Sequence, residues 1–182
     1  GWTTVMALNQ ISYRYFERLV WERFKDQILA RDFDIVHRLT PLSPTVPSTL
    51  AVRCAAAGVP FVMGPLNGGV PWPREFDSAR RKEREWLSYV RGLHRFLPGY
   101  RATRVHAAAI ICGSCDVFAQ MPDWTSAKRH YIPENAVDPA RFSAPIDREF
   151  VRLPLRVAFV GRLVPYKGAD MLIIAAADLI RQ

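Results

Sequence analysis

Short apolar runs alternate with longer amphipathic segments along this chain. Apolar residues recur at helical spacing in six segments, at 5–31, 48–57, 76–97, 102–107, 114–121 and 169–179. Compact apolar runs, as found in buried strands, lie at 34–37, 59–63, 108–112, 128–132 and 156–160. Strands that alternate with helices predict an α/β fold in which helices flank a Rossmann-like parallel sheet.

The first of these helices has the most regular amphipathic pattern. Its expected buried stripe consists of Tyr13, Phe16, Val20, Phe24 and Ile28. Charged residues, Glu17 among them, lie between these positions and are expected on the polar face. Two helix boundaries are also indicated: Gly58 can end the helix at 48–57, and Ser114 can cap the helix at 114–121.

Composition narrows the function classes. The chain has 182 residues, 49% hydrophobic and 23% charged, which is typical of a globular protein without disorder. No apolar run is long enough to span a membrane. A formal net charge of +8 favours anionic partners, such as nucleotide phosphates, acidic lipid head groups or nucleic acid. The three cysteines, an odd number, indicate a reducing compartment and hence a cytoplasmic protein.

Two of the cysteines, Cys112 and Cys115, have the C-x-x-C spacing of redox domains. They lie where a predicted strand meets a predicted helix, which is the usual place of that motif. A short strand end built from small residues explains the same pattern without any redox role.

The segment 76–97 is strongly basic. Its cations are Arg80, Arg81, Lys82, Arg84, Arg91 and Arg95. The accompanying apolar stripe is typical of a helix packed on a core with a solvated charged face. The alternative is a surface at 80–97 that contacts an anionic membrane peripherally, on its inner face. No recognised module supports binding to nucleic acid.

Polar and glycine-rich positions follow two of the predicted strands. His37 ends the run at 34–37, and Asn67, Gly68 and Gly69 follow the run at 59–63. In parallel α/β sheets, ligands bind beyond the carboxyl ends of the strands, where both segments would lie. The simpler interpretations are a histidine with a structural hydrogen bond and a glycine pair in a tight turn.

The turn at 161–168 is the strongest candidate for an anion site. Gly161 and Gly168 allow the backbone to approach a ligand closely. Arg162 and Lys167 add two cations before a helix N-terminus, whose N–H groups and dipole favour phosphate or diphosphate. An ordinary basic turn is the alternative, because the spacing matches neither G-x-x-x-x-G-K-[ST] nor G-x-G-x-x-G.

Residues 143–154 mix proline and charge without periodicity, as inter-domain linkers do. We therefore expect an incomplete N-terminal domain at 1–148, followed at 149–182 by a linker and the first strand–helix unit of a second domain. One strand and one helix cannot bury a core alone. The sequence is accordingly expected to be a fragment that is inactive by itself.

Three segments resemble family 4 (group 1) of the retaining glycosyltransferases, which have the two-domain GT-B fold. Residues 159–170 are similar to the first strand–loop–helix of the family's donor domain. Residues 131–142 resemble the family's I-P-N-G-V-D…F segment just before that domain. Residues 34–37 and 64–69 together look like the acceptor-domain region of one branch.

The resemblance implies retaining transfer from a nucleoside-diphosphate sugar to a glycan, polysaccharide or lipid-linked acceptor. Gly161, Arg162 and Lys167 would bind the donor diphosphate, where cations stabilise the charge that develops on the leaving group. His37 would be a catalytic candidate, and Asn67-Gly68-Gly69 would face the sugar or acceptor. The family generally works without a DxD-bound metal, and no cofactor or metal site is expected.

The chain departs from the family pattern in two places. Many members carry a histidine in the loop that corresponds to 65–69, and the family's paired glutamates have no counterpart before Gln182. One rival interpretation is a non-catalytic, degenerate GT-B binding or scaffold protein. A Rossmann-type oxidoreductase is disfavoured because G-x-G-x-x-G is absent, and a basic RNA-binding protein is the third rival.

Overall fold

The computed structural model describes residues 2–68, 94–142, 156–164 and 167–181. Three expectations lie outside these residues: the position of Gly69, most of the basic segment 76–97, and the domain boundary between 148 and 149. The backbone of the first helix is described from Trp2, and its side chains from Ser12.

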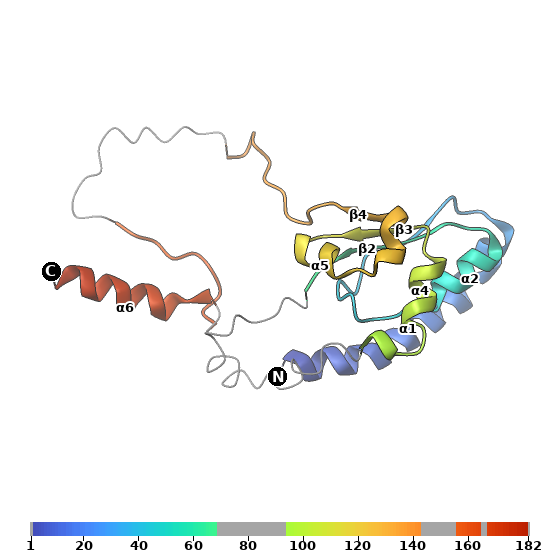
Figure 1. Ribbon diagram of the computed structural model, residues 1–182, viewed down its shortest axis with the longest axis horizontal. Coiled ribbons are helices and arrows are strands. Elements are labelled where there is room, and N and C mark those ends of the chain that lie inside the picture. Colours follow the sequence, from blue (N-terminus) through green and yellow to red (C-terminus); the bar gives the residue numbers. More distant parts are fainter. Residues whose placement is uncertain (1, 69–93, 143–155, 165–166, 182) are drawn as a thin grey trace.

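Four parallel strands form the sheet. They are β1 (Val36–Arg38), β2 (Phe61–Leu66), β3 (Ala109–Cys112) and β4 (Arg129–Tyr131), and they lie side by side in chain order (Figure 1). The predicted α/β class with a parallel sheet is therefore confirmed. β2 runs three residues further than expected, through an irregularity between Met63 and Leu66 that accommodates Pro65.

Helices connect and flank the strands. They are α1 (Trp2–Ala30), α2 (Leu50–Ala57), α4 (Tyr100–His106), α5 (Cys115–Gln120), the 3₁₀-helix η3 (Asp123–Lys128) and α6 (Ala169–Ile180). Both predicted boundaries are confirmed. Gly58 ends α2 with a left-handed φ of 77°, and the Ser114 hydroxyl accepts a hydrogen bond of 3.3 Å from the Val117 amide at the start of α5.

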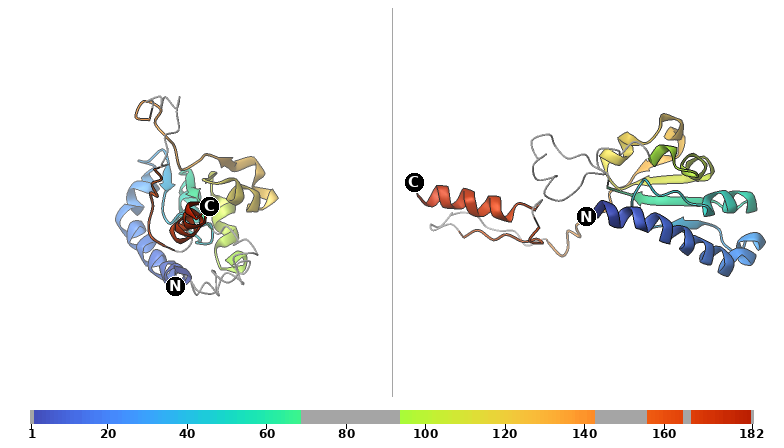
Figure 2. Two further views of the ribbon diagram at one scale, coloured as in Figure 1. Left: turned by 90° about the vertical axis from the view of Figure 1, so that its left-hand side faces the viewer. Right: turned by 90° about the horizontal axis from the view of Figure 1, so that it is seen from below.

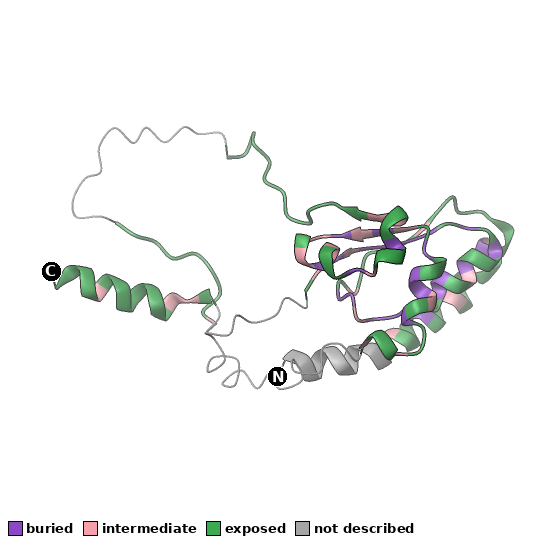
Figure 3. Ribbon diagram, in the orientation of Figure 1, coloured by how far each residue is buried: buried purple, intermediate pink, exposed green. Residues whose placement is uncertain are grey.

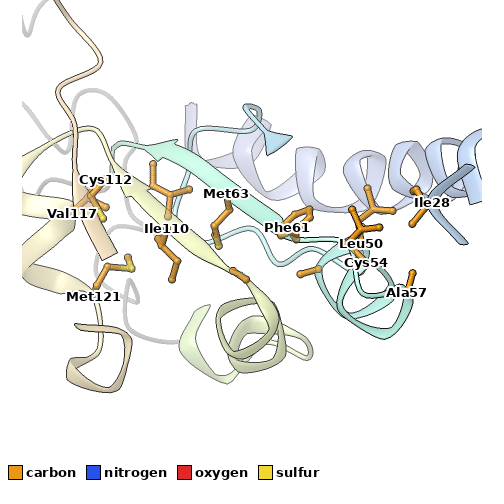
Figure 4. Close-up of a cluster of buried hydrophobic side chains, with 14 residues drawn as sticks. Ile28, Leu50, Cys54, Ala57, Phe61, Met63, Ile110, Cys112, Val117 and Met121 are labelled. Atoms are coloured by element: carbon orange, nitrogen blue, oxygen red, sulfur yellow. The ribbon is translucent and has the colours of Figure 1, made fainter. Parts of the chain in front are cut away.

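The hydrophobic core lies between the helices and one face of the sheet (Figure 4). Strands β2 and β3 contribute Phe61, Met63, Ile110 and Cys112 from that face. Helices α1, α2 and α5 contribute Ile28, Leu50, Cys54, Val117 and Met121. Burial raises the pKa of the Cys54 thiol to about 11. The alternating residues of β2 and β3 thus face the helices, as a period of two requires.

The expected buried stripe of α1 is partly wrong. Phe16 is 54% exposed, whereas Glu17 is fully buried. The Glu17 carboxylate accepts hydrogen bonds from the Ser48 hydroxyl, from the Thr49 amide at 2.7 Å and from the Thr49 hydroxyl at 2.9 Å. These groups lie at the N-terminus of α2, where a negative charge is favourable. Helix α1 is therefore turned so that Glu17 reaches α2.

Two buried arginines hold the proline-rich loop at 40–48. Arg38 donates from Nη1 to the Val46 carbonyl at 2.9 Å. Arg104 donates from Nη2 to the Pro44 carbonyl at 2.6 Å, and its guanidinium stacks 3.5 Å from the centre of the Tyr100 ring. Burial lowers the pKa of Arg104 to about 10. The loop lacks regular secondary structure, so these side chains satisfy its carbonyls instead.

The strand expected at 156–160 does not form, and this prediction is wrong. Residues 156–160 have no regular secondary structure, and Val160 is 95% exposed. Helix α6 forms as predicted, but none of its residues is buried (Figure 3). Figures 1 and 2 show α6 apart from the sheet. A strand needs a neighbour to pair its backbone groups, and the described residues provide none beside 156–160.

Among the helices that the structure describes, none has the combined length and apolar character that crossing a membrane requires.

Replacing Glu17 tests the contact between α1 and α2. Glu17→Ala leaves the Ser48 hydroxyl and the Thr49 amide without an acceptor, so we expect the free energy of unfolding to fall by about 3–5 kcal/mol. The control is Glu22→Ala, on the same helix, which removes an exposed pair with Arg18 and should cost less than about 0.5 kcal/mol. Urea denaturation measures both values. Equal losses in the two variants would contradict the buried role of Glu17.

Candidate functional site

The carboxyl ends of β2, β3 and β4 bring together a group of residues from separate segments. We call it the strand-end cluster, and it consists of Asn67, Gly113, Cys115, Tyr131 and Glu134. The backbone holds these ends in register: the Gly113 amide donates to the Leu66 carbonyl at 2.7 Å, and the Ile132 amide to the Cys112 carbonyl at 3.1 Å. Ligands of parallel α/β sheets bind at this edge.

Asn67 is the centre of the cluster. Its backbone amide donates to the Leu42 carbonyl at 2.8 Å, and this bond connects Asn67 to the loop after β1. Its side-chain oxygen accepts from the Gly68 amide at 2.7 Å, and its Nδ2 donates to Glu134 Oε1 at 2.6 Å. One asparagine thus links the segments that follow β1, β2 and β4.

Gly113 leaves room for the Glu134 side chain. A Cβ atom at Gly113 would lie 3.1 Å from Glu134 Oε2 and 3.3 Å from the Leu66 carbonyl oxygen. Both separations are tighter than ordinary carbon–oxygen contact. The missing side chain therefore lets the carboxylate cross the end of β3 on its way to Asn67.

The C-x-x-C pair divides between core and surface. Cys112 is fully buried, and this burial raises the pKa of its thiol. Cys115 is exposed, and its hydrogen bond with Tyr131 raises the pKa of the tyrosine hydroxyl. Both are free thiols. Only one of the two is accessible to a reactant.

His37 forms a hydrogen bond of 2.9 Å between its Nε2 and the Gly64 carbonyl oxygen. It lies within β1, whereas the sequence placed it at the strand end. Gly64 precedes Pro65 in the irregular part of β2. The histidine thus supports the backbone that leads to Asn67, and its catalytic role remains a prediction.

The described residues of the predicted diphosphate site, 161–164 and 167–168, lie directly before α6. The Val164 amide donates to the Arg162 carbonyl at 2.9 Å, and the Lys167 amide to the Val164 carbonyl at 3.0 Å. Both cationic side chains are exposed. Gly168 adopts a left-handed φ of 72° as the residue before the helix, and Asp170 adds a carboxylate to the first turn. The turn can present two cations, beside one opposing charge.

The structure brings some of the predicted residues together and leaves others apart. Asn67 and Gly68 lie in the strand-end cluster, whereas no hydrogen bond described for 156–181 reaches that cluster. Sequence reasoning missed the contribution of Glu134 and Gly113. A carboxylate just after the run at 128–132 was the available signal, because the carboxyl ends of parallel strands meet at one edge.

A separate pocket of about 300 Å³ opens at the start of α2 and α4. Its lining includes Arg14, Thr49, Arg53 and Gly99, and no residue that the sequence predicted for a site. Within the described residues, no group of three or more histidine, cysteine, aspartate or glutamate side chains is placed to hold a metal ion.

Thiol reactivity tests the burial of the three cysteines. At pH 8 we expect iodoacetamide to modify Cys115 at least about tenfold faster than Cys54 or Cys112, because burial and a raised pKa disfavour the thiolate of the latter two. Peptide mass spectrometry follows each site, and Cys115→Ser should remove the fast reaction. Equal rates for Cys112 and Cys115 in the native state would contradict the structure.

Comparisons with known protein families, with curated proteins and with solved structures find no match for this chain. The fold, the strand-end cluster and the basic turn at 161–168 are therefore the features that bear on function.

Proposed function

We propose that the chain belongs to a retaining glycosyltransferase, which moves a sugar from a nucleoside-diphosphate sugar to a glycan, polysaccharide or lipid-linked acceptor. The supporting observation is the 2.6 Å hydrogen bond between Asn67 and Glu134. It joins two of the segments that resemble the family, 64–69 and 131–142. Segments that are distant in the sequence meet at the edge where α/β proteins bind ligands, as a shared site requires.

In this proposal, Arg162 and Lys167 hold the donor diphosphate. Breaking the glycosidic bond concentrates negative charge on the leaving oxygen of the nucleoside diphosphate. Cations that are fixed in place stabilise that charge more in the transition state than in the ground state. The backbone hydrogen bonds at Val164 support this role, because they keep both cations on one turn. Retention and independence of metal are carried over from the resemblance.

The acceptor side is assigned to the strand-end edge. Asn67 and Gly68 shape the loop there, and His37 supports it through the Gly64 carbonyl. We place the enzyme in the cytoplasm, with the basic segment 80–97 in peripheral contact with an anionic membrane. The positive charge of that segment would favour a lipid-linked acceptor at the membrane surface.

Substitution of the two cations tests the donor site. In the full-length protein, Arg162→Ala and Lys167→Ala should each lower kcat/KM for sugar transfer by about 10²–10³, because each removes a charge that acts on the leaving group. Release of nucleoside diphosphate measures the rate. Arg181→Ala is the matched control, since it removes an exposed cation of the same segment that pairs with Asp178. Unchanged kcat/KM in both Arg162→Ala and Lys167→Ala would contradict the assignment of these residues to the donor site.

Ligand titration separates the rival functions. We expect binding of UDP- or GDP-sugars, weakened by either substitution, and none of NAD. Binding of a nucleotide sugar without turnover would favour a degenerate scaffold protein, and binding of NAD would favour an oxidoreductase.

A further inference from the structure

We propose that Glu134 is a positioning residue, which holds Asn67 and Gly68 directly after β2 in the conformation that receives the acceptor. The role toward an acceptor rests on the proposed function, whereas the hydrogen bond between Glu134 and Asn67 does not depend on it. The Glu134 carboxylate was not among the residues predicted from the sequence, and it gains its role from the fold.

Hydrogen bonds from two separate segments converge on Asn67. The Leu42 carbonyl holds its amide, and Glu134 Oε1 holds its Nδ2 from the opposite side, at 2.8 and 2.6 Å. A hydrogen bond to an ionised carboxylate is shorter and stronger than a neutral one. Asn67 is thereby fixed at both ends, and its Oδ1 in turn fixes the Gly68 amide at 2.7 Å.

The backbone angle and the surroundings of Gly68 also support a binding role. Its φ of 95° lies in the region that favours glycine, and within the described residues no atom lies within 4 Å of where its Cβ would be. Asn67 therefore holds the Gly68 amide, whereas no described residue covers the position of the missing side chain. A main chain left uncovered in this way lets a hydroxylated acceptor approach it closely.

The Glu134 side chain also fits closely over Gly113. The carboxylate reaches Asn67 only by crossing the end of β3, and Gly113 supplies the space. This path makes the contact specific. A Gly113→Ala substitution would press on Oε2 and weaken the bond to Asn67 without changing either partner.

The test compares Glu134→Ala with Glu134→Gln, because glutamine keeps an oxygen that accepts from Asn67. Glu134→Ala should speed amide hydrogen exchange in the peptide that contains Gly68. It should also raise KM for the acceptor by about tenfold or more, with donor KM unchanged, since small displacements at a reacting site are costly. Glu134→Gln should restore most of both. Asp138→Ala is the control, because that exposed carboxylate accepts a hydrogen bond from the Ala140 amide within its own turn.

Two further results decide the inference. In an Asn67→Ala background, Glu134→Ala should change the exchange rate no further, since Glu134 acts on Gly68 only through the Asn67 side chain. Wild-type exchange and acceptor KM in Glu134→Ala would overturn the positioning role. If the full-length wild-type protein transferred no sugar from any donor, the proposed function would fail and the acceptor role with it. The exchange rates would still decide whether Glu134 holds the loop.

Discussion

The buried carboxylate of Glu17 is the interaction on which the helical layer depends. A charge removed from water is costly unless hydrogen bonds and opposite partial charges compensate it. Three donors at the start of α2 provide this compensation. With α1 turned so that Glu17 reaches these donors, Ile28 is buried in the core and Phe16 remains exposed.

The same contact continues toward the functional edge. Ser48, which binds Glu17, also donates its amide to the Thr103 hydroxyl of α4 at 2.7 Å. The preceding loop is held by Arg38 and Arg104, and its Leu42 carbonyl accepts from Asn67. Separate hydrogen bonds therefore hold the loop after β1 to α1 and α4 at one end and to the strand-end cluster at the other. An irregular loop can be rigid when buried side chains satisfy its backbone.

The arrangement is suited to a site assembled from separate strands. Parallel strands direct their following segments to one edge, and here three of those segments meet at Asn67. The basic turn before α6 is a second element with complementary chemistry, because it offers cations where the edge offers amides and a carboxylate. The proposed transfer needs both kinds of group, one for the leaving diphosphate and one for the acceptor.

Sequence periodicity alone determined the order and type of most elements, including the four paired strands and α6. Gly58 and Ser114 were also predictable, because a left-handed glycine and a capping hydroxyl act within a few residues. Because the carboxyl ends of parallel strands meet at one edge of the sheet, Asn67 and Gly68 could also be placed at that edge from the sequence. These features depend on neighbours in the chain.

Only the tertiary structure decided the rest. Glu17 looked like a surface residue of an amphipathic helix, and its burial depends on donors 31 and 32 residues away. Residues 156–160 have the composition of a strand, but pairing requires a partner that the described residues do not supply. Glu134 acquired its place through Asn67 and the space above Gly113. Local patterns specify what a segment can form, and contacts between distant segments specify which side chains are buried and which meet in a site.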